Sequence, residues 1–211
     1  NIKMHKEKIY IYTFYRFKDL ENIKHIKNEL DRFSRDKLIL GTILIAEEGI
    51  NGTISGSKKN LDYLIIHIKK TLRIKKISLK ISKNSFIPFY RLKVRLKKEI
   101  VTMGEPDIDP NKTVGTYVKP ENWNDFINDP ETLIIDTRNE YEVAIGTFKN
   151  ALSPQTKSFR EFPDWVQAKL DTLPHHKRPK QIAMFCTGGI RCEKATSYLA
   201  NKGYNNVFHL E

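Results

Sequence analysis

The chain has 211 residues, enough for one or two domains, and 39% of them are hydrophobic, which predicts a folded protein rather than a disordered one. Its formal net charge of +12 predicts an anionic partner but says nothing about the fold. No apolar run approaches the roughly 18 residues of a membrane span. The polar N-terminus resembles no secretory signal, and two cysteines cannot form a disulfide framework. The composition therefore predicts a cytoplasmic protein that is not embedded in a membrane.

The excess positive charge is confined to one half of the chain. Residues 1–104 contain 24 Lys and Arg against 10 Asp and Glu, a balance of +14, whereas residues 105–211 have a balance of −2. Such asymmetry favours contact with a nucleic acid or a membrane surface. A solvated, lysine-rich face explains the same numbers, so composition leaves both interpretations open.

The first half alternates strand and helix patterns. The β-branched and aromatic run Ile9–Phe17 predicts a strand, and apolar residues spaced three or four apart predict a helix over Asp19–Phe33 with Asp19 as its N-cap. Ser57 is the expected cap of a second helix. The remaining predicted elements are strands Leu38–Ala46, Ile50–Ser55 and Ile77–Ile81 and the helix Lys58–Leu72. This order, β-α-β-β-α-β, is that of a ferredoxin-like, acylphosphatase-like domain.

A basic segment, Phe86–Met103, follows this domain. Its alternating Leu92–Leu96 portion predicts a half-buried strand whose basic residues face outward. These residues are the best nucleic-acid candidates, because Lys and Arg bind phosphates without reading sequence: Arg91, Lys93, Arg95, Lys97 and Lys98. Phe86 is expected in the core, whereas Phe89 and Tyr90 could stack on an unpaired base or pack inside. We place the first domain at 1–104, a linker at 105–118 and a second domain at 119–211.

The second half alternates short apolar strands with helices, which predicts a parallel sheet covered on both faces. Ligands of such sheets bind at the carboxyl ends of the strands. Cys186 lies at the end of the predicted strand Gln181–Phe185, before the loop residues Thr187, Gly188, Gly189, Ile190 and Arg191 and a helix over Cys192–Lys202.

This strand–CTGGIR–helix segment predicts an anion cradle. Backbone N–H groups of a tight loop and the helix N-terminus favour negative charge, and the glycines permit the curvature. We expect a thiol pKa below the ordinary value of about 8.5, with Arg191 as a permanent positive charge at the rim. Only four residues separate Cys186 from Arg191, so the ring suits a terminal sulfur atom better than a phosphate.

Residues 119–211 resemble a rhodanese domain. The strand Leu133–Asp136 with Thr137 and Arg138 is similar to the first-strand motif of that family, in which the Asp and Arg support the active site. The run from Glu142 to Ala151 resembles the next motif, with Thr147 and Asn150 in place of the usual His and Gly. The resemblance implies that Cys186 forms a persulfide, supported by Asp136 and Arg138.

Both halves together are similar to the rhodanese-containing tRNA uridine hydroxylases. The similarity rests on Gly41–Thr53, on Arg91–Val94 with Lys97–Gly104, and on Cys186–Ala195. It implies oxygen-dependent hydroxylation of the wobble uridine to 5-hydroxyuridine, with tRNA, held by its anticodon arm, as partner and molecular oxygen as co-substrate. No other cofactor is evident, no metal-ligand spacing is present, and the oligomeric state is left open. Because members usually continue with a further cysteine-containing region, the chain is expected to be truncated at its C-terminus.

The sequence leaves alternative roles open for several residues and for the protein as a whole. Cys192 could be a resolving thiol for Cys186 or simply pack at the helix start. The turn residues Glu47, Glu48 and Asn51, like Tyr90, could contact RNA or the second domain. A persulfide-forming sulfurtransferase and a non-catalytic RNA-binding module are the alternatives to the hydroxylase.

Overall fold

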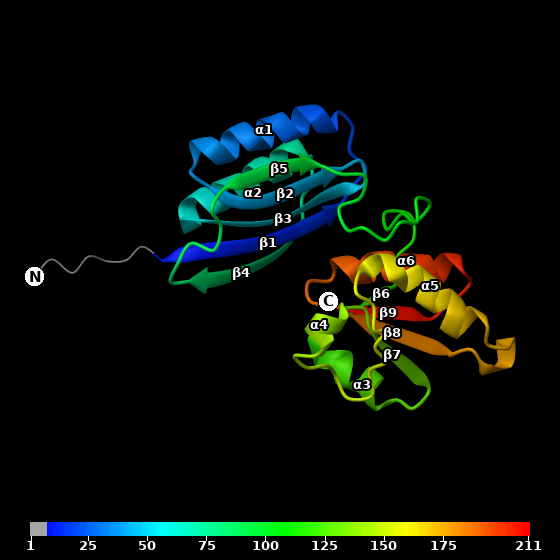
Figure 1. Ribbon diagram of the computed structural model, residues 1–211. Helices are drawn as coiled ribbons and strands as arrows, with labels where there is room; N and C mark the ends of the chain where they lie inside the picture. Colours follow the sequence, from blue (N-terminus) through cyan, green and yellow to red (C-terminus); the bar gives the residue numbers. More distant parts are fainter. Residues whose placement is uncertain (1–7) are drawn as a thin grey trace, which may run out of the picture. The chain divides into compact units, whose positions relative to one another are not determined.

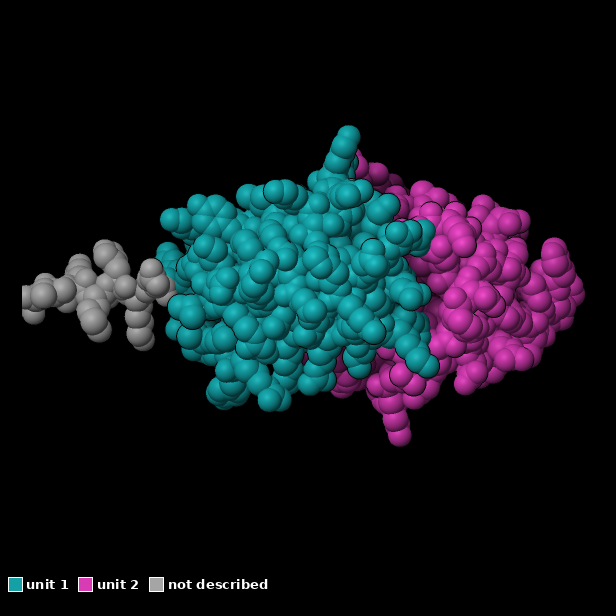
Figure 2. Space-filling view, turned by 90° about the horizontal axis from the view of Figure 1, so that it is seen from above, with its two compact units in different colours: residues 1–100 teal, residues 101–211 magenta. Residues whose placement is uncertain are grey.

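The computed structural model describes residues 8–211, which divide into two compact units at Ile100 and Val101 (Figures 1 and 2). Residues 1–7 of the predicted first domain lie outside the described part. The segment 105–118, predicted as a linker, is part of unit 2. Ile108 is buried in the core of that unit, and Thr116–Val118 forms a strand of its sheet. A Pro, Gly and Asp-rich composition thus marks turns within a packed segment.

Unit 1 contains a five-stranded sheet and two helices in the predicted β-α-β-β-α-β order, followed by one more strand. The sheet order is β4-β1-β3-β2-β5, with β5 parallel to β2 and the other neighbours antiparallel. The elements are β1 (Ile9–Phe17), α1 (Ile23–Asp36), β2 (Leu40–Ala46), β3 (Gly49–Gly56), α2 (Lys58–Thr71), β4 (Ser78–Asn84) and β5 (Leu92–Leu96). This confirms the predicted ferredoxin-like, acylphosphatase-like fold.

Both helices of unit 1 cover the same face of its sheet. One buried cluster combines Leu30 of α1 and Leu64 of α2 with Tyr12, Ile43 and Ile54 of the strands. Successive residues of a strand point to opposite faces. The strand residues that alternate with Tyr12, Ile43 and Ile54 therefore have their side chains on the face away from the helices.

The helix α1 begins later than predicted. Asp19 was the expected N-cap, but the backbone N–H groups of Lys18 and Leu20 donate to the carbonyls of Glu48 and Glu47, so this segment is tied to the β2–β3 turn. The helix starts after Asn22, whose φ of 53° lies in the left-handed region. The second prediction is confirmed, since the Ser57 hydroxyl accepts from the N–H of Asn60.

Unit 2 has a four-stranded, entirely parallel sheet in the order β6-β9-β8-β7. Its strands are β6 (Thr116–Val118), β7 (Thr132–Asp136), β8 (Gln181–Phe185) and β9 (Val207–Leu210). Its α-helices are α3 (Trp123–Asn128), α4 (Glu140–Val143), α5 (Phe162–Val166) and α6 (Ile190–Asn201). Single 3-10 turns occupy Pro120–Asn122, Phe159–Glu161 and His175–Lys177.

The parallel sheet is buried on both faces, as predicted. In β8, Met184 belongs to the cluster that contains Phe162 of α5 and Leu199 of α6, whereas its neighbour Ala183 belongs to the cluster around Trp123 of α3. The predicted helix over Ser158–Leu170 is divided into a 3-10 turn, α5 and a π-helical turn at Gln167–Asp171. The described part of the chain has no helix of the length and apolar character needed to span a membrane.

Candidate active site

Cys186 lies directly after β8, at the carboxyl edge of the parallel sheet, where the fold class predicts a ligand. The turn to α6 passes through Gly189, whose φ of 89° favours glycine. This turn brings the backbone N–H of Gly189 to 3.0 Å from the Cys186 Sγ, to which it donates. Part of the predicted anion cradle is therefore formed by the backbone itself.

The surroundings of Cys186 favour its thiolate form and lower its pKa to about 5. The largest cause is hydrogen bonding from the Cys192 thiol, followed by the backbone N–H of Cys192 and the charge of Arg191, against an opposing effect of burial. Cys186 is half-buried, whereas Cys192 is fully buried. Burial and the neighbouring thiolate raise the pKa of Cys192, so one thiol of the pair is charged and the other is its hydrogen-bond donor.

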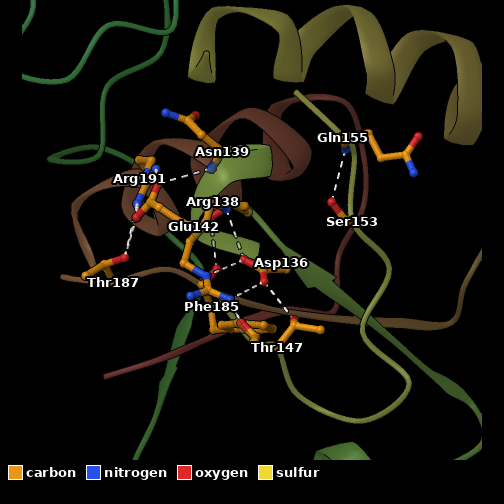
Figure 3. A network of polar contacts seen from close by, with 12 residues as sticks. Asp136, Arg138, Asn139, Glu142, Thr147, Ser153, Gln155, Phe185, Thr187 and Arg191 are labelled. Atoms are coloured by element: carbon orange, nitrogen blue, oxygen red, sulfur yellow. Dashed lines mark hydrogen bonds and ion pairs between the residues drawn. The ribbon is translucent and has the colours of Figure 1, made fainter. Parts of the chain in front are cut away.

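Arg191 is fixed by Glu142 of α4. Its guanidinium donates to both Glu142 carboxylate oxygens at 2.7 and 2.8 Å, and the Thr187 hydroxyl donates to the same carboxylate at 2.6 Å (Figure 3). These donors lower the pKa of Glu142 to about 2. Burial lowers the pKa of Arg191, but its hydrogen bonds to Glu142 and the charge and hydrogen bond of the Cys186 sulfur raise it above the ordinary value. Glu142 therefore positions Arg191 beside the cysteine.

Sequence reasoning assigned no site role to Glu142. Its one signal in the sequence was its place at the start of the motif that resembles the second rhodanese motif, 44 residues before Cys186. Charge-assisted, bidentate pairs of this kind fix an arginine more firmly than neutral hydrogen bonds do. The pairing is a long-range contact that no local pattern indicates.

Asp136 organises a second group of contacts at the end of β7. Its carboxylate is buried and accepts from the Arg138 side chain at 2.7 and 2.9 Å and from the Thr147 hydroxyl at 2.8 Å (Figure 3). Arg138 also donates to the carbonyl of Gly146 at 2.5 Å. Thr147, which replaces the usual His of the resembling motif, thus ties the β7 end to the following loop. Asn150, which replaces the usual Gly, has a φ of 64°, a left-handed conformation that Asn tolerates.

A cavity of about 500 Å³ opens beside Cys186. Its aromatic walls are Phe148 and Phe185, whose rings meet edge to face with centroids 4.8 Å apart. The Arg138 guanidinium lies 5.6 Å from the centre of the Phe185 ring. The remaining lining residues are Gly146, Thr147 and Leu210. Predominantly apolar walls with a few polar groups and a perturbed cysteine are typical of small-ligand sites.

The other predicted residues lie in unit 1. Arg91, Arg95, Lys97 and Lys98 are exposed, and Lys93 is partly exposed. Phe86 was expected in the core, but 64% of it is exposed, because the loop between β4 and β5 leaves it outside the cluster under the helices. Tyr90 is fully exposed.

Two of the three predicted turn residues of unit 1 have a structural role. The Glu48 carboxylate accepts from the N–H of Ile100, and the Asn51 side chain donates to the carbonyl of Ile100 at 2.9 Å. Glu47 is exposed. Glu48 and Asn51 thus hold the backbone where the chain leaves unit 1.

No group of three or more His, Cys, Asp or Glu side chains within residues 8–211 is placed to hold a metal ion. The described cysteines, Cys186 and Cys192, are free thiols.

Comparison with known proteins identifies both units. Residues 9–100 match the family of the UPF0176 acylphosphatase like domain, and residues 119–211 match that of the rhodanese-like domain. A tRNA uridine(34) hydroxylase of Picosynechococcus sp. (strain ATCC 27264 / PCC 7002 / PR-6) is 51% identical over 201 residues, which cover 95% of this chain and 66% of that protein. The chain thus spans about two thirds of the length of this relative.

Two solved acylphosphatases align with part of the chain at low similarity. That of Bacillus subtilis covers 41% of this chain and 98% of its own at 10% identity and a TM-score of 0.34. That of Coxiella burnetii covers 45% and 100% at 8% identity and a TM-score of 0.35. The domain assignment rests on the family matches and the observed strand order. The chain belongs to the family that joins this acylphosphatase-like domain to a rhodanese-like domain and that includes the named tRNA uridine(34) hydroxylase.

Proposed function

We propose that this protein hydroxylates the wobble uridine of tRNA at C5, with molecular oxygen as co-substrate and Cys186 as the reactive residue. One observation carries the proposal: a thiolate-forming cysteine lines an aromatic-walled cavity in a chain 51% identical to a tRNA uridine(34) hydroxylase. In such a reaction one oxygen atom enters the C5–H bond and the other leaves as water, while an external dithiol reductant supplies the two electrons and two protons and becomes a disulfide.

The cavity beside Cys186 suits a planar base. Its volume of about 500 Å³ is within the range of small-ligand sites, and the exposed Phe148 ring, which packs on the buried Phe185, offers a stacking surface. The Arg138 guanidinium supplies N–H donors at the edge of the cavity, and the carbonyl oxygens of uracil are acceptors. A uracil taken out of its stack is therefore the ligand that we assign to this cavity, with its reacting edge toward Cys186.

In this proposal the basic residues of unit 1 supply the affinity for tRNA. Exposed Lys and Arg side chains bind phosphates with little dependence on sequence, so unit 1 would hold the anticodon arm while unit 2 carries the chemistry. The residues that we assign to this role are Arg91, Lys93, Arg95, Lys97 and Lys98.

Sulfur transfer is the second candidate function. The Gly189 N–H at 3.0 Å from Cys186 Sγ and the short loop to Arg191 form a cradle that would also stabilise a persulfide. A thiosulfate sulfurtransferase should transfer sulfur to cyanide at a substantial rate and leave the nucleosides of tRNA unchanged in a strain without the gene.

Nucleoside mass spectrometry of bulk tRNA tests the proposal. A strain without the gene should lack 5-hydroxyuridine and its derivatives, the wild-type gene should restore them, and a gene encoding Cys186→Ala should not. Growth under ¹⁸O₂ should add the label to the restored nucleoside. Unchanged nucleosides in the deletion strain would refute hydroxylation, and unlabelled 5-hydroxyuridine would refute molecular oxygen as the co-substrate.

A further inference from the structure

The face of the unit 1 sheet opposite α1 and α2 carries a row of hydroxyl groups between two lysines. Direct strand partners have their side chains on the same face. The pairs Lys80 with Thr13, Thr13 with Thr53, Thr53 with Thr42 and Thr42 with Lys93 therefore form one continuous row across all five strands. The Thr13 and Thr53 hydroxyls are 3.3 Å apart and hydrogen-bonded.

The neighbouring rows on this face are also free of acidic residues. One row contains Ser78, Tyr15, Asn51, Leu44 and Arg95, and the other contains Ser82, Ile11, Ser55 and Leu40. Since adjacent strands lie about 4.8 Å apart, the hydroxyl row spans roughly 19 Å from Lys80 to Lys93. Ser55 is buried and the Asn51 side chain donates to the Ile100 carbonyl, whereas every member of the hydroxyl row is at least partly exposed. The hydroxyl row is thus accessible along its whole length, with positive charge at both edges.

Acidic residues are segregated from the strands throughout unit 1. The described part of unit 1, residues 8–100, contains nine Asp and Glu residues, and none of them lies in β1 to β5. Four lie on α1 and α2: Glu29, Asp31, Asp36 and Asp62. Chance placement of threonine on exposed strands would explain the hydroxyls alone, because β-branched residues favour strands. Low strand propensity applies to Asp, Glu and Lys alike, yet the five strands contain basic residues and no carboxylate: Arg16, Lys80, Lys83, Lys93 and Arg95.

We propose that this helix-free face binds the sugar–phosphate backbone of tRNA, with Lys80 and Lys93 on phosphates and the Thr13, Thr42 and Thr53 hydroxyls on phosphate or ribose oxygens. The inference rests on the proposed function, which supplies tRNA as the ligand. Charge complementarity selects the occupant: the surface is positive and hydrogen-bonding, and RNA offers anionic oxygens and 2′-hydroxyls at every nucleotide.

Equilibrium binding of the whole protein to unmodified tRNA over a range of salt concentrations tests this inference. The variant Lys80→Gln/Lys93→Gln should bind about tenfold more weakly, with the slope of log K against log salt reduced by about 1.4–1.8, since two phosphate contacts are lost. The control Lys24→Gln/Lys70→Gln removes the same charge from exposed positions on α1 and α2 and should change the affinity less than twofold.

A second variant separates hydroxyl contacts from charge. Thr13→Val/Thr42→Val/Thr53→Val keeps the β-branched shape and should lower the affinity about fivefold without changing the salt slope, because neutral groups release no counterions. Equal losses in the two lysine variants, or an unchanged affinity in the valine variant, would overturn the inference and leave the proposed function standing. Absence of tRNA binding by the wild-type protein would overturn both.

Discussion

The two units use charged residues in opposite ways. Unit 1 leaves a large excess of Lys and Arg exposed and keeps acidic residues off its strands, whereas the charged groups near Cys186 in unit 2 are paired side chain to side chain. Exposed charge in excess attracts a polyanion over several ångströms, while paired and partly buried charge fixes geometry. The comparison indicates that the exposed charge of unit 1 attracts an anionic ligand, whereas the paired charge of unit 2 positions the groups around Cys186.

The largest expected effect within unit 2 is on stability and concerns Asp136. Substitution Asp136→Ala leaves Arg138, whose side chain is 17% exposed, without its buried partner, and should lower the free energy of unfolding by about 3 kcal/mol. Urea denaturation measures this change. Asp125→Ala, at an exposed position on α3, should change it by less than about 0.5 kcal/mol. Similar values for the two variants would mean that paired charge in unit 2 does not support its structure.

The next effect concerns the position of Arg191. Glu142→Gln replaces a bidentate ion pair with neutral hydrogen bonds and should reduce the rate of uridine modification about tenfold, with tRNA affinity unchanged. The control is Glu140→Gln, on the exposed side of the same helix, which should modify tRNA at the wild-type rate. A loss of tRNA affinity in Glu142→Gln would show that unit 2 also contributes to binding.

The smallest effect concerns the hydrogen bond between the two thiols. In the wild type, alkylation of Cys186 by iodoacetamide should increase with pH around a midpoint of about 5, because only the thiolate reacts. Cys192→Ala removes the leading cause of the lowered pKa, so the midpoint should rise and the rate at pH 6 should fall. Cys192→Ser keeps a donor and should lie between the two. An unchanged midpoint in Cys192→Ala would assign the low pKa to Arg191 and the backbone instead.

Local patterns in the sequence were sufficient for most of the fold. The β-branched and aromatic run predicts β1, apolar residues on one helix face predict α2, and the Ser57 cap is present where the pattern places it. The predicted start of α1 was wrong because the backbone N–H groups of Lys18 and Leu20 donate to carbonyls of a turn nearly 30 residues later in the chain. The predicted burial of Phe86 was wrong because the residue type alone does not indicate whether a loop side chain packs inside or faces solvent.

In the candidate site, even more depends on contacts between distant segments that local sequence patterns do not predict. The strand, loop and helix around Cys186 are contiguous and were predicted from spacing, whereas Glu142 meets Arg191 from 49 residues away. The row of hydroxyls in unit 1 depends on the pairing register of four strand pairs, which no single segment of sequence contains. Contacts between distant segments are therefore where the structure adds most to the functional account.

The division of labour between the units is tested most directly by measuring tRNA affinity and uridine modification in the same two variants. Cys186→Ala should bind tRNA within twofold of the wild type and form no 5-hydroxyuridine. Lys80→Gln/Lys93→Gln should bind about tenfold more weakly and keep the wild-type pH midpoint for alkylation of Cys186. A tenfold loss of tRNA affinity in Cys186→Ala, or a shifted midpoint in the lysine variant, would contradict the account.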